Sequence, residues 1–345
     1  MILDFAKLNE QMKPYDQAAA GAARARWDQI AKPVGSLGNL EQVVVDIAGL
    51  TGSAQVSLSP KKVLVMCSDN GVTQENIACT PVHITRVVAE KIAGGASCVC
   101  RMAKLANAGV LAYDVGMFTP SDKVPDHAIQ RGTGNMIKGP AMSRTQAARG
   151  VAFGIECVRR CVENGDRLLA TGEMGIGNTT TSSAIASVLL DVPPARATGR
   201  GAGLTDEAFL RKQHIIEAAI ACNRPDPDDA LDVLAKVGGF DIAAMCGVFL
   251  GGSLYRIPVL VDGVISAVAA LAAYRLCEGA RLCMVASHVS AEPAARMVLD
   301  ALGLSPLITA GLRLGEGTGA VAAMPMLDMA LDIYQNMETF ADYGM

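Results

Sequence analysis

Short apolar runs alternate with longer stretches of helical periodicity along most of this 345-residue chain. Apolar runs that show no polar alternation are typical of strands buried on both faces of a parallel sheet. We predict strands over 62–67, 110–114, 167–171, 258–261 and 282–286. We predict helices over 81–92, 144–163, 179–190, 205–222, 240–250, 263–276 and 291–302. Strands separated by helices form parallel β–α–β units, so the pattern predicts an α/β fold with a doubly wound, mostly parallel sheet.

The two ends of the chain differ from this middle part. Residues 1–50 and about 319–340 have helical patterns and no strand signal. We therefore expect a smaller helical domain formed by 1–50 together with 319–345, and a large catalytic domain over 51–318. Residues 116–142 are rich in Pro, Gly, Asp and Lys, and we expect them to form a long excursion, either a lid or an interface loop.

Composition and charge limit the partners. Apolar residues make up 51% of the chain and charged residues 19%, which is typical of a folded globular protein. The net charge is −4, basic residues form no dense block and aromatic residues are only 4%, so we expect no nucleic-acid partner. The chain opens without a secretory signal, and Asp262 interrupts its longest apolar stretch, 257–274. We expect no membrane span and a cytoplasmic protein.

The ten cysteines do not form a metal-binding pattern. No Cys-x-x-Cys pair occurs, no histidine lies near a cysteine at zinc-finger spacing, and the chain has four histidines in all. We expect the cysteines to be buried as small apolar side chains, and we expect no metal site and no cofactor.

Residues 172–180 form a glycine-rich segment between a predicted strand and a predicted helix. Its pattern has the frame of a P-loop, with Asn178 at the position of the lysine. Glycine lets backbone N–H groups approach an anion closely, and the start of the helix adds a favourable dipole. Without the lysine, the segment suits one phosphate monoester better than a triphosphate. It therefore predicts a nucleotide-monophosphate site and argues against an NTPase.

Two further glycine clusters precede predicted helices. Residues 199–203 are followed by a helix that carries Arg211 and Lys212, either of which could supply the cation that Asn178 does not. Residues 311–319 place Glu316 between two glycines. Glu316 has two interpretations: a carboxylate that caps the following helix, or a general base on a tight turn.

Polar residues follow five of the predicted strands, and ligands bind beyond the carboxyl ends of strands in such sheets. The clusters expected to meet at one crevice are 68–71, 114–116, 172–180, 262–263 and 287–290. Asp69, Glu173 and Asp262 are each either a ligand-binding carboxylate or a loop anchor. His288 either orients a substrate or satisfies a loop carbonyl. No Gly-x-Ser-x-Gly elbow occurs, which argues against a serine hydrolase.

Eight segments, taken in order, resemble the nicotinate-nucleotide:dimethylbenzimidazole phosphoribosyltransferases, the family that makes the lower-ligand nucleotide of cobamides. The segments are 32–40, 68–72, 172–180, 199–203, 239–243, 261–263, 287–292 and 314–319. The resemblance extends over about residues 30–332. It implies a Rossmann-like large domain, a small helical domain from the two chain ends, and a dimer whose partner helps to close each site.

The resemblance also implies roles for individual residues. It makes Glu316 the general base. Ribose, nicotinate or the acceptor base would lie near Glu173, Asp262, Ser290, Asp69 and His83. The phosphate of nicotinate mononucleotide would lie on Gly175, Gly177, Asn178, Thr179, Gly201, Gly203 and Lys212.

One segment departs from the family pattern. Residues 80–88 carry His83 and no glutamine, where the family's acceptor helix is expected to carry one. The acceptor is therefore open among a benzimidazole or related azole, a phenol and a purine. A nucleotide-binding subunit that needs a homologous partner for turnover is the second hypothesis. A dinucleotide-dependent dehydrogenase is disfavoured, because an ordinary Gly-x-Gly-x-x-Gly followed by an acidic residue about 20 positions on is missing.

Overall fold

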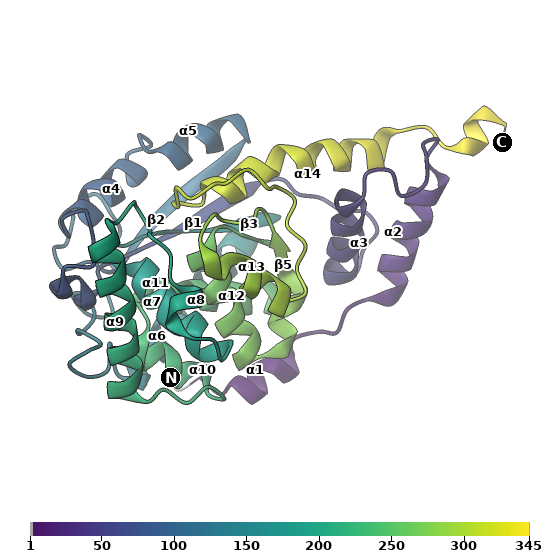
Figure 1. The fold of residues 1–345 in the computed structure, drawn as a ribbon. Coiled ribbons are helices and arrows are strands. Elements are labelled where there is room, and N and C mark those ends of the chain that lie inside the picture. Colours follow the sequence, from purple (N-terminus) through teal and green to yellow (C-terminus); the bar gives the residue numbers. More distant parts are fainter. Residues whose placement is uncertain (1–2, 345) are drawn as a thin grey trace.

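Five parallel strands form one sheet in the computed structural model, which describes residues 3–344 (Figure 1). The strands lie in the order β2-β1-β3-β4-β5 and pair in parallel throughout. The chain therefore leaves β1 first towards β2 and then returns to its other side at β3, which makes the gap between β1 and β3 a topological switch point. The strands are β1 (Lys61–Ser68), β2 (Ala108–Gly116), β3 (Leu168–Met174), β4 (Val259–Val261) and β5 (Met284–Ala286). The predicted doubly wound parallel sheet is confirmed.

The helices follow the prediction with a few differences. All seven predicted helices are present, but α5, α8 and α10 were not predicted, and the last predicted strand begins later because a 3₁₀ turn, η2 (Glu278–Cys283), occupies its start. Two further 3₁₀ turns are η1 (Gly71–Glu75) and η3 (Phe340–Tyr343). The helices are α1 (Phe5–Gln11), α2 (Gln17–Gln29), α3 (Asn39–Thr51), α4 (Ile84–Ala93), α5 (Cys98–Leu105), α6 (Arg144–Glu163), α7 (Asn178–Leu189), α8 (Pro194–Ala197), α9 (Asp206–Asn223), α10 (Ala230–Val237), α11 (Phe240–Leu254), α12 (Val264–Leu276), α13 (Pro293–Ala301) and α14 (Thr318–Asn336).

Both faces of the sheet are covered by helices, which is why its strands read as continuous apolar runs. On β1, Leu64 and Met66 belong to the apolar core that includes α6, α11 and α12. Val63 and Val65 point to the opposite face and pack in a second core with α3, α4, α5 and α14. All four side chains are fully buried. Within residues 3–344, no helix combines the length and apolar character that crossing a membrane requires.

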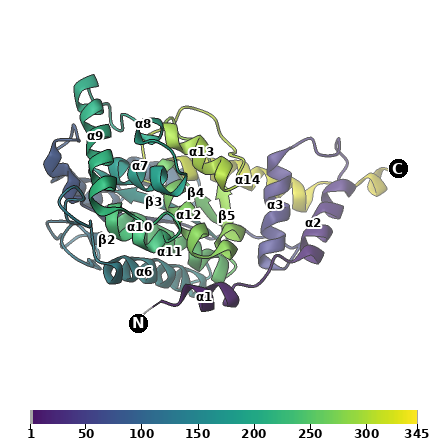
Figure 2. The same ribbon diagram turned by 60° about the horizontal axis from the view of Figure 1, so that its bottom comes forward.

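The two ends of the chain meet at the far end of α14. Trp27 of α2 packs against Tyr334 of α14 with ring centroids 5.1 Å apart. Arg26 donates hydrogen bonds to the carbonyls of Tyr334 and Met337, which end α14. In Figures 1 and 2, α2, α3 and the last turns of α14 extend away from the sheet together, whereas α1 lies elsewhere. Asn9 of α1 accepts the N–H of Gly279 in η2. The division into two domains stays a prediction.

Helices α6 and α11 approach each other closely enough to require glycine. A Cβ atom on Gly154 would lie 1.9 Å from the carbonyl oxygen of Ala244, and one on Gly247 would lie 2.0 Å from that of Val151. Both obstacles are backbone atoms that cannot move alone. These two glycines therefore fix how α11 lies between the sheet and α6, and α11 carries Asp241 at the cavity described below.

We expect Gly247→Ala to lower the free energy of unfolding by about 1–3 kcal/mol, because α6 and α11 must separate to accept the methyl group. Urea denaturation measures this change. Gly21→Ala on the exposed face of α2, where a Cβ meets nothing within 4 Å, is the matched control and should be neutral or slightly stabilising. Equal midpoints for the two variants would contradict this account of the packing.

Candidate active site

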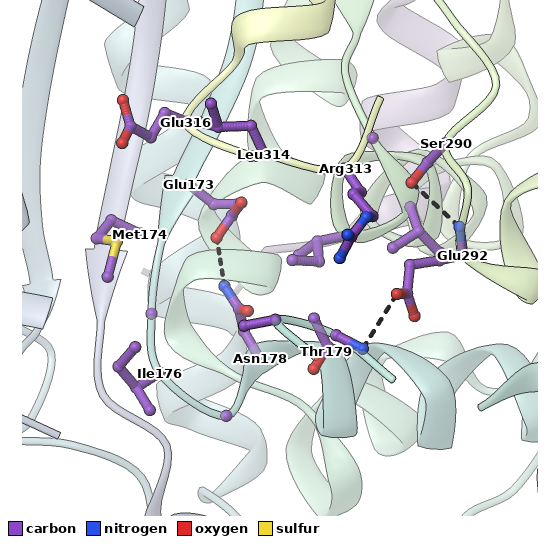
Figure 3. A pocket seen from close by; sticks show the side chains of 18 of the residues that line it. Glu173, Met174, Ile176, Asn178, Thr179, Ser290, Glu292, Arg313, Leu314 and Glu316 are labelled. Atoms are coloured by element: carbon purple, nitrogen blue, oxygen red, sulfur yellow. Dashed lines mark hydrogen bonds between the residues drawn. The ribbon is translucent and has the colours of Figure 1, made fainter. Parts of the chain in front are cut away.

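A cavity opens beyond the carboxyl ends of β3, β4 and β5 (Figure 3). Three of the five predicted polar clusters line it, namely those that follow these three strands. The clusters that follow β1 and β2 do not supply lining residues. The remaining lining residues come from the segment after η1, from Val88 of α4, from the first turn of α12 (264–266), from Glu292, and from residues 200–204 and 312–318.

The glycine-rich turn after β3 is shaped by close backbone contacts. A Cβ on Gly175 would lie 2.4 Å from the carbonyl oxygen of Ser68, so this position admits only glycine. Gly177 has a φ of 94° and is the N-cap of α7. The turn brings Thr179, in the first turn of α7, to the cavity wall. The start of a helix thus faces the cavity, as the sequence predicted for a phosphate site.

Asn178 does not offer its side chain to a phosphate. Its Nδ2 donates to Oε2 of Glu173 at 2.5 Å and to Oδ2 of Asp241 at 3.0 Å, and the residue is buried. An amide nitrogen has two hydrogens, so both are used. The residue at the lysine position of the P-loop pattern therefore links two carboxyl groups.

The pKa of Glu173 is raised to about 8, mainly by burial and also by the charges of Asp241 and Asp262, while hydrogen bonds from Asn178 and the backbone of Glu316 oppose the shift. Burial likewise raises the pKa of Asp241 to about 6. Like charges at close range cannot all ionise, so the pair retains a proton at neutral pH. Glu173 is therefore a hydrogen-bond donor at neutral pH and is poorly suited to act as a base.

Glu316 lies on a strained turn that is held from two sides. Its φ is 60°, and both neighbours, Gly315 and Gly317, also have positive φ. Asp262, at the end of β4, accepts the N–H groups of Gly317 at 3.2 Å and Ala320 at 2.9 Å. A non-glycine residue in this region persists only where its surroundings determine it, and such sites cluster at functional positions.

The carboxylate of Glu316 is half-buried at the cavity wall, and its Oε2 accepts the N–H of Val99 at 3.1 Å. Val99 lies in the first turn of α5, whose N-cap is Ser97. The capping interpretation of Glu316 therefore applies to α5, whereas at α14 the N-cap, Gly317, has no side-chain hydrogen bond. One carboxylate oxygen is anchored, so the orientation of the group is restricted and the other oxygen is left without this bond.

The second glycine cluster binds a carboxylate of the chain itself. Oε1 of Glu292 accepts the N–H of Gly201 at 3.1 Å, and its Oε2 occupies the space beside Gly199, where a Cβ would lie only 1.8 Å away. Nζ of Lys212 is fully buried and donates to Thr179 Oγ1 and to the carbonyl of Gly199, both at 3.0 Å. Burial lowers the pKa of Lys212 to about 8, and the charge of Glu292 opposes this shift. Neither Gly203 nor Lys212 lines the cavity.

Arg313 was not predicted but lines the cavity. Its guanidinium points into the space between Glu173 and Glu292 (Figure 3). Arg200, the other arginine of the wall, is bound to the carbonyl of Leu204 and to Asp206. A glycine-bounded turn with an arginine three residues before Glu316 was visible in the sequence, but nothing in the pattern indicated its direction.

The opposite end of the cavity is apolar. In Figure 3, Met174 and Ile176 lie on the side of Glu316, away from Arg313 and Glu292. Other apolar residues of the wall are Ile77, Ala78, Cys79 and Val88, and further ones are Ala202, Leu204, Val264, Ile265, Leu312 and Leu314. Sequence reasoning placed the acceptor at residues 80–88, which include Val88, and missed the other members because they come from different segments of the chain. The cavity thus has an apolar end beside Glu316 and a polar end beside Arg313 and Glu292.

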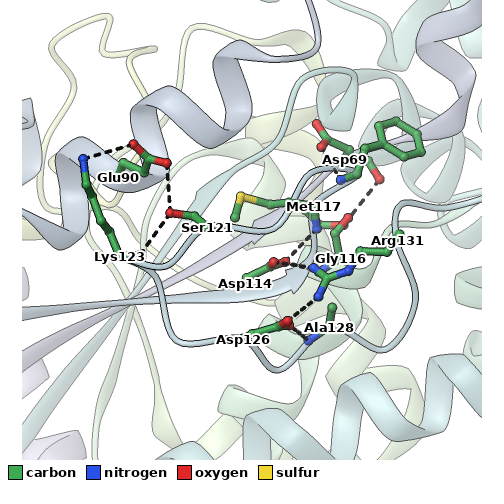
Figure 4. A network of polar contacts seen from close by, with 12 residues as sticks. Asp69, Glu90, Asp114, Gly116, Met117, Ser121, Lys123, Asp126, Ala128 and Arg131 are labelled. Atoms are coloured by element: carbon green, nitrogen blue, oxygen red, sulfur yellow. Dashed lines mark hydrogen bonds and ion pairs between the residues drawn. The ribbon is translucent and has the colours of Figure 1, made fainter.

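Besides Gly203 and Lys212, two more predicted site residues do not line the cavity. Asp69 accepts the N–H of Phe118 at 2.7 Å and so holds the chain that leaves β2 (Figure 4); burial raises its pKa. Arg131 joins Asp114 and Asp126 in the same network. His83 is exposed at the N-cap of α4. Asp69 therefore follows its loop-anchor interpretation.

Ser290 and His288 both line the cavity. Oγ of Ser290 accepts the N–H of Glu292 at 3.4 Å, and Nδ1 of His288 lies 3.1 Å from Oγ of Ser287. Burial lowers the pKa of His288, and Asp262 opposes this shift. Among residues 3–344, no group of three or more His, Cys, Asp and Glu side chains has the arrangement of a metal site.

Comparison with known proteins identifies the family. Residues 12–345 match the sequence profile of a family described as "Phosphoribosyltransferase". The chain belongs to this family. It is 45% identical to the nicotinate-nucleotide–dimethylbenzimidazole phosphoribosyltransferase of Ruminiclostridium cellulolyticum, with 93% of this chain and 92% of the relative covered. It is 44% identical to the enzyme of the same name from Desulforudis audaxviator, over 97% and 96% of the two chains.

A solved structure supports the same assignment. The crystal structure of CobT from Thermus thermophilus superposes with a TM-score of 0.89 at 37% sequence identity, over 95% of this chain and 99% of that one. The family resemblance inferred from the eight segments is confirmed. The roles of individual residues stay predictions, which the geometry above now refines.

The buried proton of Glu173 should make the stability of this phosphoribosyltransferase fall with pH. The pKa of Glu173 is about 8 in the folded chain, whereas that of an unfolded glutamate is about 4.3. Between these values the unfolded chain releases the proton and the folded chain keeps it, so stability is lost as the pH rises. Glu173→Gln removes this loss. The free energy of unfolding of Glu173→Gln minus that of the original protein should therefore increase as the pH rises. We expect an increase on the order of 1–3 kcal/mol between about pH 5 and pH 8.

Urea denaturation at several pH values measures this difference. Parallel curves for the two proteins would show that Glu173 titrates normally and would overturn this account of the site.

Proposed function

We propose that this chain transfers the 5-phosphoribosyl group of nicotinate mononucleotide to an aromatic lower-ligand base, releasing nicotinate, in the assembly of the cobamide nucleotide loop. One observation carries the proposal: an anchored carboxylate, Glu316, stands at the apolar end of a cavity whose other end is polar. The family membership and the names of the relatives support it.

The chemistry requires few groups. In nicotinate mononucleotide the ring nitrogen is a pyridinium, so its departure from C1′ removes a positive charge and needs no acid. The incoming azole attacks C1′ through its imine nitrogen while its N–H proton is removed. Glu316 is the proposed base for that proton, and the walls of the cavity supply the alignment of the two rings.

The apolar end suits a flat aromatic acceptor. Ile77, Val88, Met174 and Ile176 can bury the faces of a ring, and Cys79 and Thr80 add two weakly polar groups. A benzimidazole or related azole is the proposed acceptor, with a phenol or purine as alternatives. His83 is exposed outside the cavity, so we no longer propose it as an acceptor ligand.

The polar end suits the phosphate, with a change to the predicted ligands. The start of α7, with Thr179, and the guanidinium of Arg313 face the cavity. The N–H of Gly201 is used by Glu292, so a phosphate can take it only after Glu292 moves, and Gly203 and Lys212 do not line the cavity. We therefore propose Arg313 as the cation that first meets the phosphate.

The assembly is a separate part of the proposal. We infer a homodimer, with a heterodimer of homologous subunits as the alternative, from the family resemblance. Light scattering after size exclusion distinguishes a monomer from a dimer. Turnover that appears only after a homologous subunit is added would favour the second hypothesis.

The proposed function is tested by incubating the protein with nicotinate mononucleotide and a panel of benzimidazoles, phenols and purines. Nicotinate should be released in step with a new ribosylated base, and only when a suitable acceptor is present. No release with any acceptor, alone or with a homologous partner, would refute the proposal.

Loss of the base should slow the chemical step. We expect Glu316→Gln to reduce kcat by roughly 10²-fold or more, with the KM for nicotinate mononucleotide changed far less. Gln keeps the acceptor oxygen that bonds the N–H of Val99, so the turn is retained. An unchanged kcat would remove Glu316 from the mechanism.

Loss of the cation should weaken binding instead. Arg313→Gln should raise the KM for nicotinate mononucleotide by about tenfold, which is the scale of one charge-assisted hydrogen bond, while kcat changes less. The KM of Arg313→Lys should lie between that of the original protein and that of Arg313→Gln. Arg211→Gln is the matched control, because Arg211 pairs with Glu207 on the surface of α9 and lies outside the cavity wall. Equal KM values for the original protein and Arg313→Gln would contradict the role.

A further inference from the structure

Behind the cavity wall, three side chains form a buried chain of hydrogen bonds. Glu173, at the end of β3, bonds to Asn178 of α7, and Asn178 bonds to Asp241 at the start of α11. Asp241 is fully buried, and its second oxygen accepts the N–H of Ile242. Asp241 does not line the cavity, so it can reach a bound substrate only through Asn178 and Glu173.

The backbone around this chain leaves room for it. A Cβ on Gly175 would lie 2.9 Å from Oδ2 of Asp241, and one on Gly239 would lie 2.5 Å from its Oδ1. The same atom on Gly239 would lie 2.7 Å from Oδ1 of Asn70, which is a buried oxygen without a hydrogen-bond partner in the described chain. Two acceptor oxygens thus face the space beside Gly239, which leaves no room there for a side chain.

The two oxygens of Glu173 have different surroundings. Oε2 is bound by Asn178, whereas Oε1 lies against the turn that carries Glu316, 2.7 Å from where a Cβ on Gly315 would be. Glu173 lines the cavity, and Oε1 is the oxygen that Asn178 does not bind. An uncharged Glu173 can donate to a hydroxyl of a bound ribose and does not repel the carboxylate of Glu316.

We propose that Asp241 is a positioning residue that, through the side-chain amide of Asn178, fixes the orientation of Glu173 and keeps its carboxyl uncharged at the cavity. The amide holds Glu173 in place by one hydrogen bond, and the nearby charge of Asp241 disfavours a second negative charge. This goes beyond the proposed function, because neither Asp241 nor the Asn178 link takes part in the transfer itself, although the activity test below rests on that function.

Among residues 3–344, no lysine or arginine is bonded to these three side chains, and the guanidinium of Arg313 points into the cavity between Glu173 and Glu292. Asp262 beyond β4 acts on Glu173, and Asp69 beyond β1 acts on Asp241, both with negative charge. The thiol of Cys67 on β1 lies near the same carboxyl groups, and burial raises its pKa. From α7 the facing group is the neutral amide of Asn178, and from the following turn it is the backbone of residues 315 and 316.

The test is the pH profile of kcat/KM for nicotinate mononucleotide. Because an uncharged Glu173 is required, activity should fall at alkaline pH as Glu173 ionises. Asp241→Asn keeps the size and the acceptor oxygen but removes the charge, so the alkaline limb should move to lower pH by about one unit. Asp241→Glu keeps the charge and should leave the limb in place even if kcat falls. Asp114→Asn, a buried strand-end carboxylate bound to Arg131 outside the cavity, is the matched control and should not move the limb.

A uniform loss of activity in Asp241→Asn with an unmoved alkaline limb would show a merely structural role and overturn the proposal. A second readout does not depend on activity: the side-chain carboxyl carbon of Glu173 can be titrated by ¹³C NMR in the ligand-free protein, with Glu173→Gln identifying the signal. Its midpoint should fall in Asp241→Asn. An unchanged midpoint would overturn the proposal even in an active transferase, and a lowered midpoint would support it even if no acceptor were turned over.

Discussion

The two hydrogen bonds from Asp262 to the start of α14 are the interaction on which the site depends. They join the end of β4 to the turn of residues 315–317 and so hold Glu316 in a backbone conformation that it would not adopt alone. A Cβ on Gly172 would collide with the carbonyl of Glu316, so β3 packs directly against the same turn. Sheet, turn and α14 therefore form one rigid support for the proposed base.

The carboxyl edge of this sheet is unusual in how it balances charge. Glu173, Asp241 and Asp262 are buried there, and their partners are backbone N–H groups and one amide. Because no lysine or arginine among residues 3–344 is bonded to them, the balance is reached by retained protons. The cations Lys212 and Arg313 stand at the polar end, which separates the region that binds an anion from the region that handles a proton.

Much of the fold could be predicted from the sequence because a sheet covered on both faces must have continuous apolar strands. The five strands and seven of the helices followed from this pattern, and so did the meeting of the clusters after β3, β4 and β5. Helices α5 and α10 were missed because they are short, with eight residues each, and apolar patterns of that length are ambiguous. The site was predicted less well. Asn178 and Gly201 were predicted to bind the phosphate, but they are hydrogen-bonded to Asp241 and Glu292, which lie far away in the sequence. Arg313 and the apolar wall depend on side-chain direction, which no spacing reveals.

The account makes one spatial claim above all: the acceptor base lies at the apolar end with its N–H directed at Glu316. A crystal structure of the protein with nicotinate mononucleotide and 5,6-dimethylbenzimidazole, in the Glu316→Gln variant to prevent turnover, tests it directly. The account predicts that the side chain of residue 316 lies within about 2.6–3.2 Å of the base nitrogen that loses its proton, with the phosphate beside Arg313 and the start of α7. A base bound elsewhere, or one with its N–H directed away from residue 316, would contradict it.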